Sequence, residues 1–150
     1  MATAKVIFAT ITGNNEDIAD IIAQTLEEKG LDVETEEISL VDPSDLSDVD
    51  LFVICPYTYD EGSLPDEGLD FYEDLETVDL SGKIYGVAGS GDTFYGDDFC
   101  LAVDKFDQAI AKTGAKKGAK NVKIDLSPDD DEKIARIEDF ATTLADVVLK

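Results

Sequence analysis

The sequence contains no histidine and no tryptophan, and only two cysteines, Cys55 and Cys100, occur in its 150 residues. Without histidine, a Ser-His-Asp or Cys-His nucleophile system is excluded. Zinc, haem and iron–sulfur sites need histidines or clustered cysteines, so we expect no such metal site. Two cysteines that form no Cys-x-x-Cys pair are typical of small buried apolar residues in a reducing compartment.

Basic residues are also scarce. Lys and Arg number 12 against 35 Asp and Glu, which gives a formal net charge of −23. Such a surface repels phosphate backbones and anionic lipids, so nucleic acid and membranes are poor partners and basic proteins are favoured ones. The acidity has an alternative role in solubility, or in a salty cell interior, and the sequence leaves that open.

Long apolar runs are missing as well. No run approaches the roughly 20 residues that cross a bilayer. The first eight residues lack the basic and then apolar pattern of a signal peptide. We therefore expect a cytoplasmic protein. The length is ordinary for one domain, so residues 1–150 are predicted to form a single domain.

Strand-like apolar runs alternate with helical patterns along the whole chain. Strands are predicted at 6–9, 33–38, 51–55, 84–88 and 119–126. Helical spacing follows the first, third, fourth and fifth of them, starting at Glu16, near Leu69, near Phe99 and after Pro128. Because each parallel connection needs a right-handed crossover, this order predicts an α/β fold with a parallel sheet and helices on both faces.

The loop after the first strand carries donors suited to an anion. In sheets of this kind, ligands bind beyond the carboxyl ends of the strands, where the strand order reverses. This loop places hydroxyls, amides and backbone N–H groups at a helix start, in the sequence Thr10-Ile11-Thr12-Gly13-Asn14-Asn15. It lacks the Lys of a nucleotide-triphosphate loop and the GxGxxG of a dinucleotide loop. Taken alone, it is equally consistent with an ordinary helix N-cap.

The loops after the third and fourth strands carry aromatic residues. Tyr57 and Tyr59 follow the third strand, and Tyr95 follows the fourth. Aromatic side chains from two neighbouring loops can enclose a planar ring. Each tyrosine alone is more typical of a loop residue packed on the fold, but together with the first loop the three segments indicate one shared ligand.

These three segments resemble a bacterial flavodoxin. The resemblance rests on T-x-T-G-N-N-E from Thr10 to Glu16, on Tyr59 within Thr58-Tyr59-Asp60, and on G-S-G-D-T-F-Y from Gly89 to Tyr95. It covers the whole chain, and the absence of a long insertion in the fifth strand indicates the short-chain class. It implies a flavodoxin-like doubly wound sandwich with a five-stranded parallel sheet of order 2-1-3-4-5.

The resemblance also implies the function. A flavodoxin binds FMN non-covalently and carries electrons at low potential between redox partner proteins, with no catalytic residue and no substrate of its own. The implied partners are a donor of the flavodoxin reductase type and electron-accepting enzymes, each with a basic docking face. A monomer is expected.

The family pattern assigns roles to individual residues. The first loop is implied to hold the FMN phosphate, Tyr59 to cover the inner or edge face of the isoalloxazine ring, and Tyr95 to stack on its outer face. The residues implied to bind the cofactor are Thr10, Ile11, Thr12, Gly13, Asn14, Asn15, Pro56, Tyr57, Thr58, Tyr59, Asp60, Glu61, Gly62, Ser90, Gly91, Asp92, Tyr95, Phe99 and Cys100.

Three positions depart from the common pattern. Asn15 stands where many flavodoxins have Thr, Tyr59 where many have Trp, and Asp60 where Gly is common. In the family, a peptide at the Asp60-Glu61 position flips when the flavin is reduced. Asp adopts a positive φ less readily than Gly, so this flip is predicted to be less favourable here.

Charge is predicted to be unevenly distributed. Carboxylates in the second and third loops would make the reduced flavin a strong reductant. Lysines are predicted to gather at the opposite pole, namely Lys5, Lys29, Lys83, Lys112, Lys116, Lys117, Lys120 and Lys150. The resulting dipole would turn the flavin edge toward a basic partner.

Three other functions compete with a general electron carrier. A response-regulator receiver would need an acidic pair after the first strand and an Asp after the third, where Phe8-Ala9-Thr10 and Cys55-Pro56-Tyr57 stand. A flavin reductase would need a substrate pocket above the ring, and a chain of 150 residues has few residues left to build one. A reductant dedicated to one enzyme partner stays open as the third alternative.

Overall fold

The computed structural model describes residues 2–8, 14–55, 71–91, 101–125 and 131–149. The strands are β1 (Thr3–Phe8), β2 (Asp32–Glu37), β3 (Leu51–Cys55), β4 (Ile84–Gly91), β5 (Lys116–Lys117) and β6 (Val122–Asp125). The α-helices are α1 (Asn14–Glu28), α3 (Leu101–Ala111) and α4 (Asp131–Leu149). Short 3-10 helices are η1 (Ile38–Leu40), η2 (Pro43–Asp48) and η3 (Leu75–Thr77), and residues 71–74 form a helical turn before η3.

All strand pairs of the described sheet are parallel, and the order β2-β1-β3-β4-β5 confirms the predicted 2-1-3-4-5. β2 lies at one edge of the sheet, and its mostly exposed residues fit that position. β3 is central and buried along its whole length, which explains why Leu51–Cys55 is uniformly apolar.

The fifth strand differs from the prediction. Instead of one strand over 119–126, β5 and β6 pair in turn with the same side of β4, and residues 118–121 separate them. A Cβ on Gly118 would lie 2.7 Å from Ile84 Cγ2 and 2.8 Å from Leu144 Cδ2. The chain therefore passes very close to the core at Gly118, and this close approach accompanies the break in the strand.

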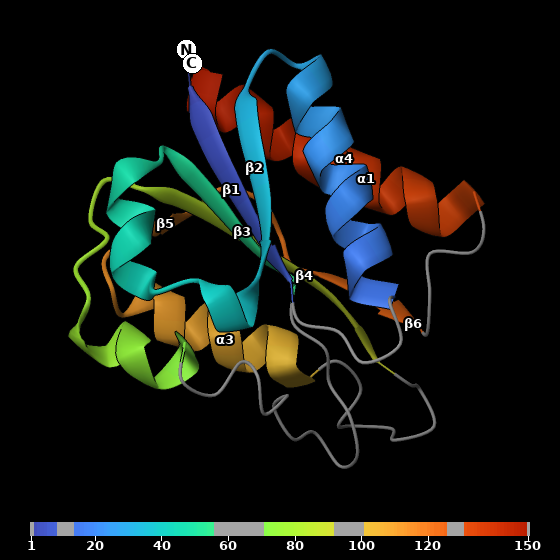
Figure 1. Cartoon of the computed structure of the whole chain (residues 1–150). Coiled ribbons are helices and arrows are strands. Elements are labelled where there is room, and N and C mark those ends of the chain that lie inside the picture. The colour runs from blue at the N-terminus through green and yellow to red at the C-terminus, as the bar shows by residue number, and fades with distance from the viewer. Residues whose placement is uncertain (1, 9–13, 56–70, 92–100, 126–130, 150) are drawn as a thin grey trace.

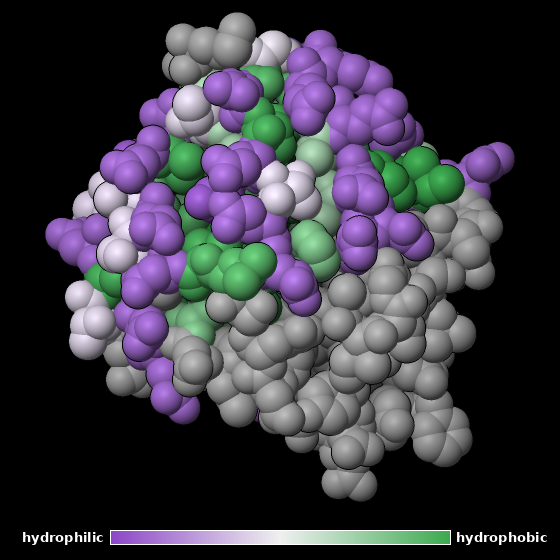
Figure 2. All heavy atoms as spheres, viewed as in Figure 1, coloured by the Kyte–Doolittle hydropathy of each residue, from purple (hydrophilic) through white to green (hydrophobic). Residues whose placement is uncertain are grey.

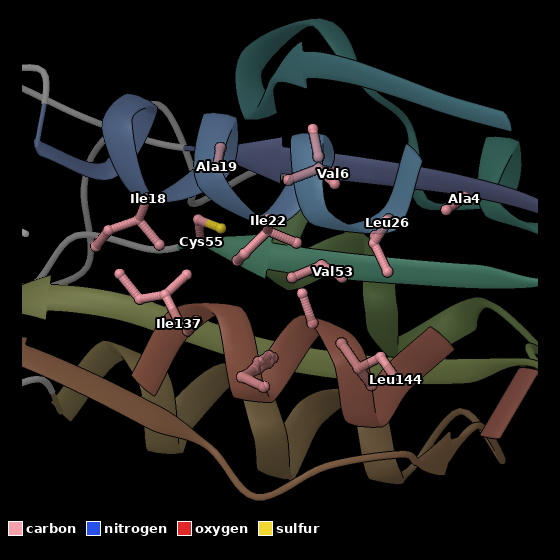
Figure 3. Close-up of a cluster of buried hydrophobic side chains, with 14 of the residues drawn as sticks. Ala4, Val6, Ile18, Ala19, Ile22, Leu26, Val53, Cys55, Ile137 and Leu144 are labelled. Atoms are coloured by element: carbon pink, nitrogen blue, oxygen red, sulfur yellow. The ribbon is translucent and has the colours of Figure 1, made fainter. Parts of the chain in front are cut away.

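Alternate side chains of the sheet enter two separate cores. On one face, Val6 and Val53 pack with α1 and α4, and Figure 3 shows Leu26 of α1 and Leu144 of α4 pointing toward each other within this layer. On the other face, the sheet packs against α3 and the short helices, with Phe52 at the centre. The result is a three-layer sandwich with helices on both faces, as predicted (Figure 1).

The helices follow the apolar spacing that predicted them. Val103, Phe106 and Ile110 of α3 are fully buried, as are Ile137 and Leu144 of α4. α1 is followed by Gly30 at φ +98°, the left-handed conformation that ends many helices. Among the described residues, no helix is both long and apolar enough to span a membrane.

Candidate functional site

The carboxyl ends of three neighbouring strands form a step at one edge of the sheet. Phe8 at the end of β1 is level with Cys55 at the end of β3. Ile54 is level with Val87, so Cys55 is level with Ala88, and β4 continues through Gly89–Gly91 beyond the end of β3. At 3.3 Å a residue, β4 extends about 10 Å past β1 and β3. We call this arrangement the sheet-end step.

The extension of β4 forms the tall side of the step, the ends of β1 and β3 form its low side, and β6 supports the tall side. It pairs with β4 from Ala88↔Val122 to Gly91↔Asp125, so the extension of β4 stays within a sheet and is not a single projecting strand. The extension has the sequence Gly89-Ser90-Gly91. Because these residues have small or no side chains, a flat ligand can approach the backbone closely there.

The step coincides with the point where the strand order reverses. From β1 the chain continues to β2 on one side, whereas β3 and β4 lie on the other. In open parallel sheets, ligands bind at such a switch point. α1 begins at Asn14, six residues after the end of β1, so its first turn lies at this same edge and directs backbone N–H groups there.

Carboxylates surround the low side of the step. Glu37 is level with Phe8 at the end of β2, and Asp42 follows η1. Hydrogen bonds from the backbone N–H and hydroxyl of Ser44 lower the pKa of Asp42, which keeps its carboxylate ionised. Glu16 and Asp17 lie in the first turn of α1 and add further negative charge.

Cys55 contributes an apolar surface, not a reactive group. Its side chain is fully buried within the core that α1 and α4 cover, and the thiol is free. Burial raises the pKa of the Cys55 thiol far above its usual value, so it stays protonated. This confirms the interpretation of Cys55 as a small buried apolar residue. Cys100 lies outside the described residues.

The structure places four of the predicted cofactor-binding residues. Asn14 and Asn15 are the first two residues of α1, and Ser90 and Gly91 are the last two of β4. The others lie outside the described residues, namely Thr10, Ile11, Thr12, Gly13, Pro56, Tyr57, Thr58, Tyr59, Asp60, Glu61, Gly62, Asp92, Tyr95, Phe99 and Cys100. Each of these segments joins a strand end at the step.

Comparison with known proteins decides the family. A family model for flavodoxins matches residues 6–140, from β1 into α4. The chain belongs to the flavodoxin family. As a flavodoxin, it carries electrons on FMN between redox proteins and is not an enzyme with its own substrate.

Individual relatives agree with this membership. A probable flavodoxin of Bacillus subtilis is 39% identical over 141 residues, which are 94% of this chain and 89% of that protein. A solved short-chain flavodoxin associated with a bacterial microcompartment is 51% identical, with a TM-score of 0.95 over 99% of each chain. The flavodoxin of Streptococcus pneumoniae TIGR4 is 54% identical, with a TM-score of 0.93 over 97% of this chain and 99% of that one. The expected short-chain class is thereby confirmed.

The described residues at the step fit FMN. A flavin needs a flat apolar contact beside its ring and donors for its phosphate. The Gly89-Ser90-Gly91 end of β4 offers the first, since its sequence leaves the backbone open to close approach by a flat ring. The first turn of α1 offers the second, because its N–H groups have no partner within the helix.

The sequence analysis did not predict that β4 extends beyond the ends of β1 and β3. The strand that begins at Ile84 was predicted to end at Ala88, with Gly89-Ser90-Gly91 assigned to a loop. β4 instead continues to Gly91 because β6 pairs with it there. The only signal in the sequence was the alternation of apolar residues at Val122, Ile124 and Leu126, which predicts a strand but does not say which strand it pairs with.

Proposed function

We propose that the three segments at the sheet-end step hold FMN non-covalently, and that electrons pass through the flavin edge that they leave exposed. The observation that carries this proposal is the convergence of the β1, β3 and β4 ends with the start of α1 at one switch point. FMN supplies the one-electron chemistry when it is bound. The protein contributes the binding, orientation and electrostatic environment.

The phosphate would be bound by residues 10–15 without any basic side chain. The hydroxyls of Thr10 and Thr12 and the N–H groups at the start of α1 are neutral donors. Hydrogen bonds to a charged acceptor are stronger than those between neutral groups, so several together can replace an ion pair. Glu16, in the first turn of α1, would weaken this binding through its negative charge.

The ring would lie between the segments after β3 and β4. Tyr59 and Tyr95 would cover its two faces and exclude water from them, with each ring contact adding about 0.5–1.5 kcal/mol beyond burial. The backbone of Asp60-Glu61 would hydrogen-bond the ring edge and respond to its protonation. These roles follow from the resemblance.

Redox partners would approach the step with a basic face. In support, the carboxylates of Glu37, Asp42 and Glu16 lie on elements at that edge of the sheet. Lys29 follows α1, Lys83 precedes β4 and Lys112 follows α3. All three therefore lie toward the amino-terminal ends of the parallel strands, away from the sheet-end step. This polarity would orient the protein during encounter, and added salt would slow electron transfer. A single monomeric domain in the cytoplasm stays part of the proposal.

Titration of the apoprotein with FMN tests the proposed site. Quenching of flavin fluorescence gives the affinity. We expect Thr12→Ala to weaken FMN binding about tenfold, because one hydrogen bond to a charged group is worth about 1.5–3 kcal/mol. Thr77→Ala is the matched control, since Thr77 bonds only the Asp74 carbonyl in η3 among the described residues. Equal affinities for all three proteins would contradict the assignment of the phosphate loop.

A further inference from the structure

A stretch of 12 residues reverses the charge of this very acidic chain. Residues 112–123 contain five lysines and no Asp or Glu, although the whole chain carries −23. The stretch includes β5 and the start of β6, which lie along β4 at the end of the sheet order away from β2. We call residues 112–123 the basic edge.

The opposite edge of the sheet has the opposite charge. β2 carries Asp32, Glu34, Glu36 and Glu37 within its six residues. Lys5 forms an ion pair with Glu36, with 3.3 Å between Nζ and Oε1. Figure 2 shows mainly hydrophilic side chains on the face that includes β2 and α1. The sheet is therefore polarised from edge to edge, in addition to any polarity between the ends of its strands.

Two of the five lysines are neutralised within the fold. Lys117 pairs with Asp107 at 2.9 Å, and Lys123 pairs with Asp104 at 2.7 Å. The other three, Lys112, Lys116 and Lys120, are exposed and form no ion pair within the part of the chain that the structure describes. Among the described residues, therefore, no ion pair offsets these three exposed charges.

A groove lies between the basic edge and α4. Its volume is about 430 Å³, and the residues lining it include Lys120, Val122, Arg136 and Phe140. Val122 and Phe140 belong to the core, with 8% and 4% of their surface exposed. Arg136 donates a hydrogen bond to the Lys123 carbonyl at 3.2 Å, which holds its guanidinium beside the groove. The groove thus combines an apolar base with two cations, Lys120 and Arg136, and one carboxylate, Asp139.

We propose that the basic edge and this groove bind an acidic peptide segment of a partner protein, with carboxylates on the lysines and an apolar side chain in the groove. This surface follows the side of the sheet along β5 and the start of β6, whereas the sheet-end step is formed by the carboxyl ends of β1, β3 and β4. The proposal goes beyond electron transfer itself, because it assigns the chain an anchoring surface of its own.

A short segment fits this surface better than an extended polyanion does. Charges are screened beyond about 8 Å at physiological ionic strength, so a short segment experiences mainly the local lysines. A nucleic acid or an anionic membrane would extend beyond the groove, over carboxylates of α4 such as Glu138. A second copy of this chain also carries a net charge of −23, so the two molecules would repel each other overall.

Binding of a synthetic peptide tests the proposal. The probe is a fluorescein-labelled peptide in which glutamates alternate with leucines, added to the FMN-loaded full-length protein and followed by fluorescence anisotropy. We expect Lys116→Glu and Lys120→Glu each to weaken binding about threefold, and the double variant about tenfold, because reversed rim charges oppose the encounter. Flavin absorbance, read in the same samples, reports the cofactor site separately.

Lys29→Glu is the matched control, since it makes the same charge change at an exposed lysine after α1. Amide shifts in the wild type should map to residues 116–123 and 136–143. Equal weakening by Lys29→Glu would overturn the proposal, as would shifts confined to the flavin end. Displacement of the peptide by a short DNA duplex, or self-association that Lys116→Glu abolishes, would assign the edge to another occupant and refute it. If the peptide does not bind and the variants aggregate, the lysines only protect an open sheet edge.

Discussion

The hydroxyl of Tyr85 in β4 donates a hydrogen bond to the carboxylate of Asp107 in α3, with 2.5 Å between Oη and Oδ1. The second oxygen of Asp107 accepts bonds from Lys117 Nζ and Asn121 Nδ2, each at 2.9 Å. One carboxylate thus joins β4, α3, β5 and the break between β5 and β6. The Asp107 carboxylate thereby links residues of the basic edge, Lys117 and Asn121, to Tyr85 in the sheet.

Removing this carboxylate should destabilise the fold. Asp107→Ala leaves the partly buried Tyr85 hydroxyl and the Asn121 amide without their acceptor, and we expect a loss of about 2–3 kcal/mol in the free energy of unfolding. Asp104→Ala on the same helix is the control, because its pair with Lys123 is half exposed and should contribute under about 1 kcal/mol. Urea denaturation measures both. Similar losses for the two variants would contradict the role given to Asp107.

The same carboxylate should make stability depend on acidity. Burial raises the pKa of Asp107, but hydrogen bonds from Lys117, Tyr85 and Asn121 outweigh burial and lower it overall. Because the folded pKa lies below the unfolded one of about 3.9, the stabilisation is present above that pH and is lost as pH falls below it. Urea midpoints from about pH 5 to pH 2.5 should therefore fall less steeply for Asp107→Asn than for the wild type. Parallel slopes would show that Asp107 titrates normally.

We expect any side chain at position 86 in place of Gly86 to destabilise the fold. A Cβ there would lie 2.6 Å from Phe140 Cζ and 2.8 Å from Leu144 Cδ1, because α4 packs directly on β4 at this point. We expect Gly86→Ala to cost about 1–3 kcal/mol of unfolding free energy through overpacking. Adding Phe140→Leu should recover part of that loss, so the double variant should be more stable than the sum of the single effects predicts. Simple additivity would argue against the contact.

Glu16 should weaken cofactor binding. Its carboxylate lies in the first turn of α1, next to the proposed phosphate site, and two negative charges there repel. We expect Glu16→Gln to bind FMN about two- to fivefold more tightly at low salt, with the gain shrinking as salt is added. Asp20→Asn, one turn further along α1, is the control and should change the affinity less. A loss of affinity in Glu16→Gln would place the phosphate elsewhere.

Much of the fold was readable from the sequence because apolar spacing reports burial directly. Val103, Phe106 and Ile110 recur at helical spacing and are all buried. The uniformly apolar β3 predicted its central position, and right-handed crossovers then leave few topologies. The break at 118–121 was not readable, since it depends on how closely α4 approaches Gly118.

The candidate site was readable in part. Its motifs stand in the sequence, and the structure brings together the strand and helix ends that carry them. The extension of β4 to Gly91 depends on pairing with β6, which is distant in sequence. The lysines of the basic edge were visible in the sequence, and Lys116 and Lys117 were predicted to lie at the pole opposite the flavin. They are level with Ile84 and Tyr85 at the start of β4, which agrees with that prediction. The sequence did not predict that Lys123 continues the same side of the sheet, level with Gly89.

An anaerobic reductive titration of the FMN-reconstituted protein, followed by its absorbance, tests the central claim most directly. The account predicts that one FMN binds per chain and that reduction proceeds in two separate one-electron steps, the second at low potential. Failure to bind FMN, or reduction in a single two-electron step, would contradict electron carriage by this chain.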